Sequence, residues 1–258
     1  MMSGPNLTRA FARNAAESAY PNLWRGLVAA WAPPGAPRHA TRLWDYSGNG
    51  NHGTLRNGAN WAPGKHGHAL NFDGTDDDVI GDTPGKNFPV GNQSRTVACW
   101  IKSPGWSGDK GLLHWGKDGG TPAASNYQIV AGNGGTIHWG NGYGHGILAG
   151  TIIVSDDKWH HVAGTYQNGT ASIYIDGKLD VSGFHTPSTL LDTAWRWGRF
   201  QNSFGAWVGQ LIGCLVYVRA LNNKEVNMLS KHIDPFVKKS LIRATRFYKK
   251  SGAFASVF

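Results

Sequence analysis

Charged residues, cysteine and long apolar runs are all scarce in this chain of 258 residues, and each scarcity excludes a class of protein. Charged residues make up 16% of the sequence and hydrophobic residues 40%, which is too apolar for an intrinsically disordered chain. No run of about 18 apolar residues occurs, so we expect no membrane span. The two cysteines, Cys99 and Cys214, are too few for a disulfide framework, and two buried thiols are favoured over a single bridge.

Glutamate is also scarce, since Glu17 and Glu225 are the only two in the sequence, and neither falls on a predicted strand. Retaining glycosidases need two carboxyl groups about 5–5.5 Å apart around the scissile bond. No Asp-x-Asp strand pattern replaces the missing glutamates, and no Gly-x-Ser-x-Gly motif occurs. We therefore expect no catalytic residues and a protein that is not an enzyme, with glycoside hydrolysis as the weakest alternative.

Glycine and tryptophan are abundant instead, with 36 and 12 residues. Short β-type runs broken by glycine-rich turns predict an all-β, two-sheet antiparallel jelly-roll sandwich. The predicted strands are Leu27–Trp31, His68–Phe72, Asp78–Gly81, Arg95–Lys102, Gly111–Trp115, Asn126–Ala131, Thr136–Trp139, Ile147–Val154, Trp159–Tyr166, Ala171–Ile175, Leu179–Ser182, Ala194–Gly198 and Trp207–Tyr217.

Local signals add a hairpin and short terminal helices. Asp176-Gly177 between two β runs suits a two-residue hairpin turn, because both residues tolerate positive φ. A helix is predicted after Asn222 or Asn223, with Val226, Leu229 and Ile233 on its apolar face. A second short helix is predicted over residues 6–19, before Pro21.

The positive charge is concentrated at the C-terminus. The whole chain carries a formal charge of +9, but residues 23–235 hold 17 basic and 15 acidic residues. We therefore divide the chain into an N-terminal arm (1–22), a sandwich domain (23–235) and a basic tail (236–258). The tail contains no acidic residue, and its proposed anchoring residues are Phe236, Lys238, Lys239, Arg243, Arg246, Lys249 and Lys250. Such a tail could bind an acidic partner or be a solvated extension.

Several motifs follow one another in a recognisable order. They are Gly26–Trp31, Asp45–Leu55, Gly67–Asp77, Trp159–Tyr166, Ile173–Gly177, and Arg219–Asn222 with Glu225–Val226. Together they resemble a LamG-like jelly-roll domain of the concanavalin A-like lectin/glucanase superfamily, over roughly residues 23–233. The superfamily includes lectins, adhesion modules and glycosidases, so the resemblance implies fold more than function.

Asp234-Pro235-Phe236 and the basic residues after it resemble the end of LamG-like proteins encoded by phages and environmental bacteria. This resemblance implies a structural or decoration protein of a virion, with capsid proteins and repeated copies of itself as partners. The alternative is a lectin-like carbohydrate-binding or adhesion module. Residues 7–20 contain no continuous apolar run, so we expect no cleaved secretion signal. The expected location is a virion, or else the extracellular space or cell surface by another route.

Aromatic residues in glycine-rich loops are the predicted ligand-binding residues, because sugar sites need aromatic faces and hydrogen-bonding groups. They are Trp106, in a loop, and the cluster Trp139, Asn141, Tyr143 and His145. Core packing is the competing explanation for each tryptophan. The nearly neutral body predicts no nucleic-acid specificity.

Asp73, Asp76 and Asp77 follow a predicted strand and offer several oxygens to a hard cation. The resemblance implies calcium at this place, together with an acidic residue on the last strand. That residue is absent near Gly213 and Cys214. The aspartates therefore either hold calcium or cap turns by accepting hydrogen bonds from nearby backbone N–H groups, and the missing residue favours turn capping. No other cofactor is expected.

Overall fold

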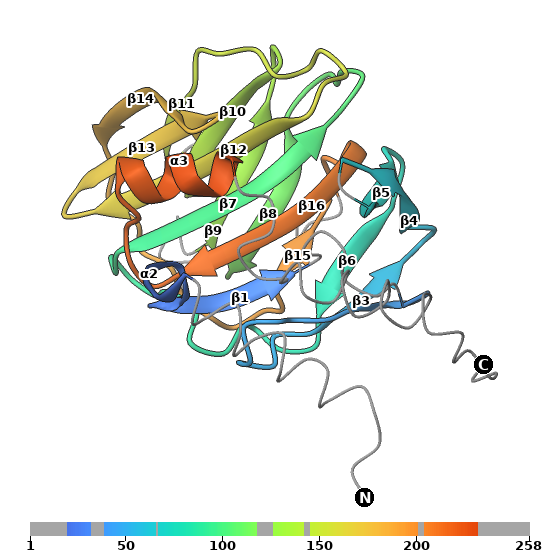
Figure 1. Cartoon of the computed structure of the whole chain (residues 1–258), viewed down its shortest axis with the longest axis horizontal. Helices are drawn as coiled ribbons and strands as arrows, with labels where there is room; N and C mark the ends of the chain where they lie inside the picture. Colours follow the sequence, from blue (N-terminus) through green and yellow to red (C-terminus); the bar gives the residue numbers. More distant parts are fainter. Residues whose placement is uncertain are drawn as a thin grey trace, which may run out of the picture.

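The computed structural model of the chain describes residues 20–31, 39–65, 67–117, 126–141, 145–200 and 204–231 (Figure 1). The predicted helix over residues 6–19, Tyr143, Ile233 and the basic tail lie outside these residues. The described residues form two antiparallel sheets packed face to face, as the sequence predicts. None of the helices in these ranges is long and apolar enough to cross a membrane.

The first sheet contains the longest strands. Its strands in spatial order are β14 (Lys178–Phe184), β13 (Thr170–Ile175), β12 (His160–Gln167), β7 (Arg95–Lys102), β16 (Val208–Tyr217), β5 (Gly67–Asp73) and β4 (Asn60–Gly64), and β1 (Leu27–Trp31) pairs with β16. The β13–β14 turn is the predicted two-residue hairpin, because Asp176 and Gly177 have φ values of 51° and 79°.

The second sheet lies behind the first in Figure 1. Its strands in spatial order are β11 (His145–Ala149), β10 (Thr136–Asn141), β9 (Asn126–Gly132), β8 (Lys110–Gly116), β15 (Arg196–Trp197), β6 (Asp78–Gly81), β3 (Gly53–Arg56) and β2 (Arg42–Leu43). The predicted strand Ile147–Val154 stops early, because Asp180 accepts hydrogen bonds from the backbone N–H groups of Thr151 and Ile152 and draws the chain out of the sheet.

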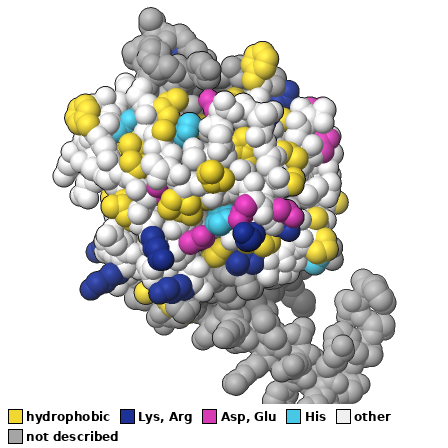
Figure 2. Space-filling model, turned by 90° about the horizontal axis from the view of Figure 1, so that it is seen from above, with side chains coloured by type: hydrophobic (Ala, Val, Ile, Leu, Met, Phe, Trp, Pro, Cys, Tyr) yellow, Lys and Arg dark blue, Asp and Glu magenta, His cyan; other side chains and the backbone are white. Residues whose placement is uncertain are grey.

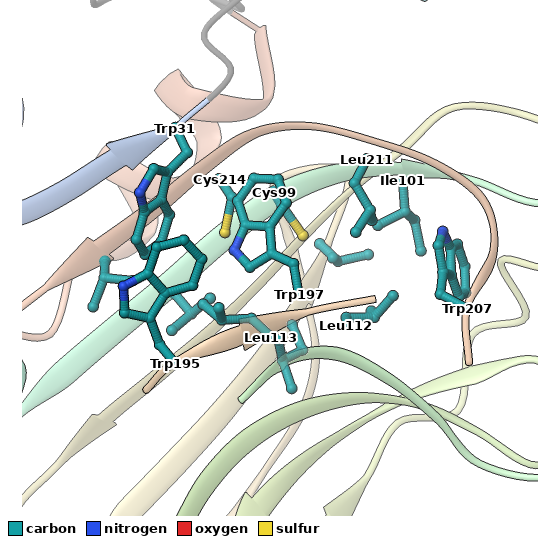
Figure 3. Close-up of a cluster of buried hydrophobic side chains, with 14 of the residues drawn as sticks. Trp31, Cys99, Ile101, Leu112, Leu113, Trp195, Trp197, Trp207, Leu211 and Cys214 are labelled. Carbon is teal, nitrogen blue, oxygen red and sulfur yellow. The ribbon is translucent and has the colours of Figure 1, made fainter. Parts of the chain in front are cut away.

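The core between the sheets is rich in tryptophan. Trp31 packs against Trp195 with ring centroids 4.3 Å apart and against Trp197 at 5.5 Å. Figure 3 shows these indoles beside Cys99 and Cys214. Both cysteines are buried free thiols, the favoured one of the two predicted states. Burial of these large rings is the main source of stability of the sandwich.

Two helices, α2 (Pro21–Trp24) and α3 (Asn223–Lys231), cover part of the outer surface of the first sheet (Figure 1). Leu23 and Trp24 of α2 and Val226 and Leu229 of α3 belong to one apolar cluster with outward-facing residues of this sheet. The predicted Asn222 cap is confirmed, because its Oδ1 accepts hydrogen bonds from the N–H groups of Lys224 and Glu225. Neither of these two helices belongs to the surface of the second sheet.

Candidate functional site

The face of the second sheet that points away from the core carries a cross-strand row of mostly polar residues. Their neighbours along each strand belong to the core, and alternate side chains of a strand point to opposite faces. The pairing registers join these positions from one edge of the sheet to the other. In spatial order this outer-face row consists of Arg42, Thr54, Ile80, Arg196, His114, Gln128, Gly140 and Ile147.

His114 at the centre of the row is a buried polar group without a partner. It has no exposed surface, and neither ring nitrogen has a hydrogen-bond partner within the described part of the chain. Burial, and to a smaller extent the charge of Arg196, lowers the pKa of His114 from 6.5 to about 3. The imidazole is therefore neutral at pH 7, with one donor and one acceptor left unused. Its row neighbour Gln128 is 5% exposed.

Asp78 orients the two arginines nearest to His114. Its fully buried carboxylate accepts hydrogen bonds from Arg56 Nε at 2.8 Å and from Arg56 Nη2 at 2.5 Å. Arg196 Nε lies 3.5 Å from the same carboxylate, and Arg196 Nη1 donates to the carbonyl of Phe200 at 3.1 Å. Both guanidinium groups therefore point at protein acceptors, while His114 keeps its unused hydrogen-bonding groups.

The segment that follows β15 packs on the outer face beside His114. A Cβ atom at Gly111 would lie 2.5 Å from the carbonyl carbon of Arg199 and 2.7 Å from the nitrogen of Phe200, so only glycine admits this approach. Phe204, a few residues further on, is 72% exposed. This places an exposed aromatic ring on a segment that adjoins a polar surface, a combination common in ligand sites.

Trp139 lies in the core, although the sequence suggested it as a ligand-binding residue. It has no exposed surface, and its ring packs edge-on against Tyr127 with centroids 4.9 Å apart. A Cβ atom at Gly164 would collide with its ring. The cause is strand alternation, because Gly140 takes the outward position and Trp139 the inward one.

Trp106 is half-buried and is held in place by the protein itself. Its Nε1 donates to the carbonyl of Gly132 at 2.9 Å, and its ring packs on Trp207 at 5.2 Å. Gly132 pairs with the first residue of β10, whereas Asn141 is the last and pairs with His145. The structure therefore places Trp106 and the Asn141–His145 pair at opposite ends of β10; the side chains of Asn141 and His145, like all of Tyr143, lie outside the described atoms.

The three aspartates predicted to hold calcium do come together. Asp73, Asp76 and Asp77 lie between β5 and β6 with carboxylate oxygens within 4.8 Å of one another. Asp77 is 2% exposed, and within the described ranges its Oδ1 has no hydrogen-bond partner. Burial raises the pKa of Asp77 and the charges of its acidic neighbours add to the rise, against the hydrogen bond from Asp73 N–H. Three carboxylates with one buried, unsatisfied oxygen fit a hard cation such as calcium.

Turn capping is present at the same place. Asp73 Oδ1 accepts a hydrogen bond from the N–H of Thr75 at 2.7 Å, and Asp77 Oδ2 accepts one from the N–H of Asp73 at 2.8 Å. Val208 of β16 pairs with Asp73, and β16 carries no acidic residue. A bound calcium ion would therefore be held by these three carboxylates and by water or carbonyl oxygens.

A second group of charged residues ties two loops together. His160 Nδ1 lies 2.9 Å from Asp176 Oδ2, and His160 Nε2 lies 3.0 Å from Asp156 Oδ1. Lys158 extends the group by donating to Asp156 at 2.6 Å. Because both ring nitrogens face protein carboxylates, His160 joins the β13–β14 hairpin to the loop before β12. Figure 2 likewise shows side chains of both charges mixed on the face seen from above, without separation by sign.

Sequence reasoning missed the outer-face row. One signal was available, since His114 stands between Leu113 and Trp115 in an apolar strand, where a polar residue on the outward face needs an explanation. The partners Arg196 and Gln128 could not be assigned, because the register that aligns them with His114 joins three separate segments.

A family model described as the concanavalin A-like lectin/glucanases superfamily matches residues 73–227. The chain belongs to this family, and the predicted jelly-roll fold is confirmed. A search of curated protein sequences gave no significant match.

Solved structures with the same fold include both binding domains and parts of enzymes. The binding domain of Paraclostridial mosquitocidal protein 1 is 17% identical with a TM-score of 0.63, covering 81% of this chain and 52% of that one. For Trypanosoma rangeli sialidase the values are 18%, 0.63, 83% and 34%. For domain 4 of an extracellular arabinanase from Geobacillus stearothermophilus, solved with arabinotriose, they are 19%, 0.60, 79% and 98%.

At these identities the likeness establishes the fold alone. The chain spans about half the length of the mosquitocidal binding domain and about a third of the sialidase.

Proposed function

We propose that this protein is a non-catalytic carbohydrate-binding module that uses the outer-face row of its second sheet. The observation that carries the proposal is His114, a buried, neutral imidazole without a partner, aligned with Gln128 and Arg196. A buried donor or acceptor without a partner costs stability, so its presence on an outward face favours a role in binding. Hydroxyl-rich ligands supply paired donors and acceptors, which match such groups.

The chemistry of the described carboxylates supports a role without catalysis. Glu225 is bound by Arg219 and by the N–H of Asn222. Asp78, the carboxylate beside the row, is held by Arg56 and Arg196. Glycoside hydrolysis needs one carboxyl group as an acid and a second as a nucleophile or base, and neither of these two is placed for that work.

The related structures support the same proposal in a general way. One is called a binding domain, and another is an arabinanase domain solved with arabinotriose. Both share the sandwich with this chain, which makes a saccharide the first ligand class to test.

The proposal is tested with the full chain on a glycan array, using Phe204→Ala and a matched control. Phe204 is an exposed apolar side chain beside the row, and Met228 is one on α3, against the other sheet. We expect at least one glycan class to bind, a several-fold loss of affinity in F204A, and no change in M228A. Absence of binding to every glycan would overturn the proposal. Release of reducing ends from a bound glycan would show catalysis and overturn its second half.

We also propose that the basic tail anchors the protein to a virion. The observation in favour is the sequence contrast between a nearly neutral body and a tail with six basic residues and no acidic one. An assembly with a negative surface would attract such a tail. The test replaces the six basic tail residues by glutamine in the full chain and measures co-sedimentation with particles from the source lysate. The control replaces the exposed lysines Lys178, Lys224 and Lys231.

Loss of co-sedimentation in the tail variant alone supports the virion location. Equal sedimentation of both variants, or none with the unaltered chain, contradicts it and leaves a free or cell-surface module.

A further inference from the structure

Resting on the proposed function, we infer that His114 and Gln128 recognise hydroxyl groups of an uncharged saccharide, and that His114 is retained for binding at the expense of stability. The two residues are paired across β8 and β9 and face the same side of the sheet. This inference adds a ligand class and a specific contact to the general proposal of a carbohydrate-binding module.

The packing of His114 argues against a structural role. A structural histidine on an apolar strand uses at least one ring nitrogen in a hydrogen bond, as His161 of this protein lies between charged and aromatic neighbours, 5.3 Å from the Trp100 ring. His114 has no exposed surface and no partner for either nitrogen among the described residues. An aliphatic side chain of similar size would fill the same space without leaving unsatisfied polar atoms.

The ligand class follows from the charges around the site. The depressed pKa keeps His114 neutral at pH 7, and the amide of Gln128 is also neutral. The nearby positive charges are directed elsewhere, because Asp78 holds Arg56 and Arg196, and the Phe200 carbonyl accepts from Arg196. The centre of the row therefore offers a donor and an acceptor on a ring next to an amide. Adjacent hydroxyl groups on a sugar ring present the same alternation of donor and acceptor.

Access to His114 requires a local movement. The ring has no solvent-exposed surface, and the described segment that adjoins it is the Arg199–Phe200 backbone above Gly111. This segment holds Arg196 through one hydrogen bond, from Nη1 to the carbonyl of Phe200. Displacing it would expose the centre of the row to a ligand, in exchange for the hydrogen bonds that His114 lacks.

The test measures affinity and thermal stability of the full chain carrying His114→Leu, with Gln128→Leu as a second variant. The control is His138→Leu, a half-buried histidine on the same face of β10 that bonds to Thr136. The probes are arabinotriose and other neutral oligosaccharides, compared with oligosaccharides of uronic acids. We expect H114L to lose at least tenfold in affinity for a neutral glycan while its Tm rises. Q128L should lose affinity, and H138L should keep it.

The outcomes separate the two proposals. If the unaltered chain binds neither class of glycan, the proposed function itself fails. If it binds only uronic-acid oligosaccharides, the module stands but the inferred ligand class is wrong. If H114L lowers Tm and leaves affinity unchanged, His114 is structural and the inference is overturned. If H114L does not fold, unchanged affinity in Q128L overturns the assigned contact.

Discussion

The guanidinium of Arg219 donates two hydrogen bonds, each 2.8 Å long, to the two carboxylate oxygens of Glu225 at the start of α3. It also donates to the backbone carbonyls of Asn22 and Arg25, which are 197 and 194 residues away in sequence. Burial disfavours the Glu225 carboxylate, but the bonds from Arg219 and from Asn222 N–H outweigh it and lower the Glu225 pKa. One side chain therefore fastens the closing helix to the first described segment.

Replacing Arg219 by methionine should destabilise the fold. It would leave Glu225, whose side chain is 12% exposed, without its counter-charge, and breaking a buried pair in this way costs about 3 kcal/mol. Urea denaturation of R219M measures the loss. Lys224→Met, an exposed change on the same helix, should stay within about 0.5 kcal/mol of the unaltered chain. Equal stability of R219M and K224M contradicts the role of Arg219.

Stability should fall as the pH drops below about 6.5, because two buried histidines resist protonation. Burial lowers the pKa of His114 to about 3, and it lowers that of His161 to about 4 against the opposing charge of Asp176. The unfolded chain therefore binds more protons between pH 6.5 and these values. The stabilisation is fully present above pH 6.5, and each group adds about 1.4 kcal/mol of loss per pH unit below it.

The measurement is the free energy of unfolding at pH 7.5 and pH 5, for the unaltered chain and for His161→Gln. Carboxylates such as Glu225, whose folded pKa is depressed, act in the same direction but only at lower pH. The loss between the two pH values should be smaller in H161Q. An identical loss in both proteins means that His161 is not responsible.

Calcium should raise the melting temperature through Asp73, Asp76 and Asp77. An ion that binds only the folded state stabilises it by about 2.7 kcal/mol at 100 times its Kd. Thermal unfolding in calcium chloride and in EDTA should differ for the unaltered chain and coincide for Asp77→Asn. Asp157→Asn, an exposed carboxylate elsewhere, should keep the calcium response. No response in the unaltered chain leaves turn capping as the role of the cluster.

Trp139→Ala should act on stability rather than on ligand recognition. The fully buried indole packs against Tyr127, and truncating a buried tryptophan costs about 3–5 kcal/mol. Denaturant unfolding should show this loss, with a smaller one for Trp139→Phe. A W139A protein of normal stability that no longer binds a glycan would return Trp139 to the list of ligand contacts.

Most of the fold could be predicted, because strand alternation and turn residues are local signals. The hairpin at Asp176-Gly177 is confirmed in type and position. The strands that were missed lack such signals. β2 has two residues, and β4 is a polar edge strand that includes Pro63, a residue that sheets tolerate at their edges.

Much less of the site could be predicted, for a physical reason. Trp139 seemed available for a ligand because its neighbours are glycines, but the side of the sheet to which it points depends on the register with Ile129 and Leu148. The outer-face row likewise exists only through pairing between separate segments, and no local pattern specifies that His114 lies beside Arg196.

The antiparallel pairing of β1 with β16, from Leu27 opposite Tyr217 to Trp31 opposite Cys214, has a consequence for biosynthesis. While the chain is being made, β1 leaves the ribosome long before its partner exists. Trp31, which anchors the tryptophan core, must wait for the last strand before it can be enclosed. Because such distant contacts close slowly, the nascent chain would expose apolar strands until synthesis is almost complete, and chaperone binding would be most useful during that interval.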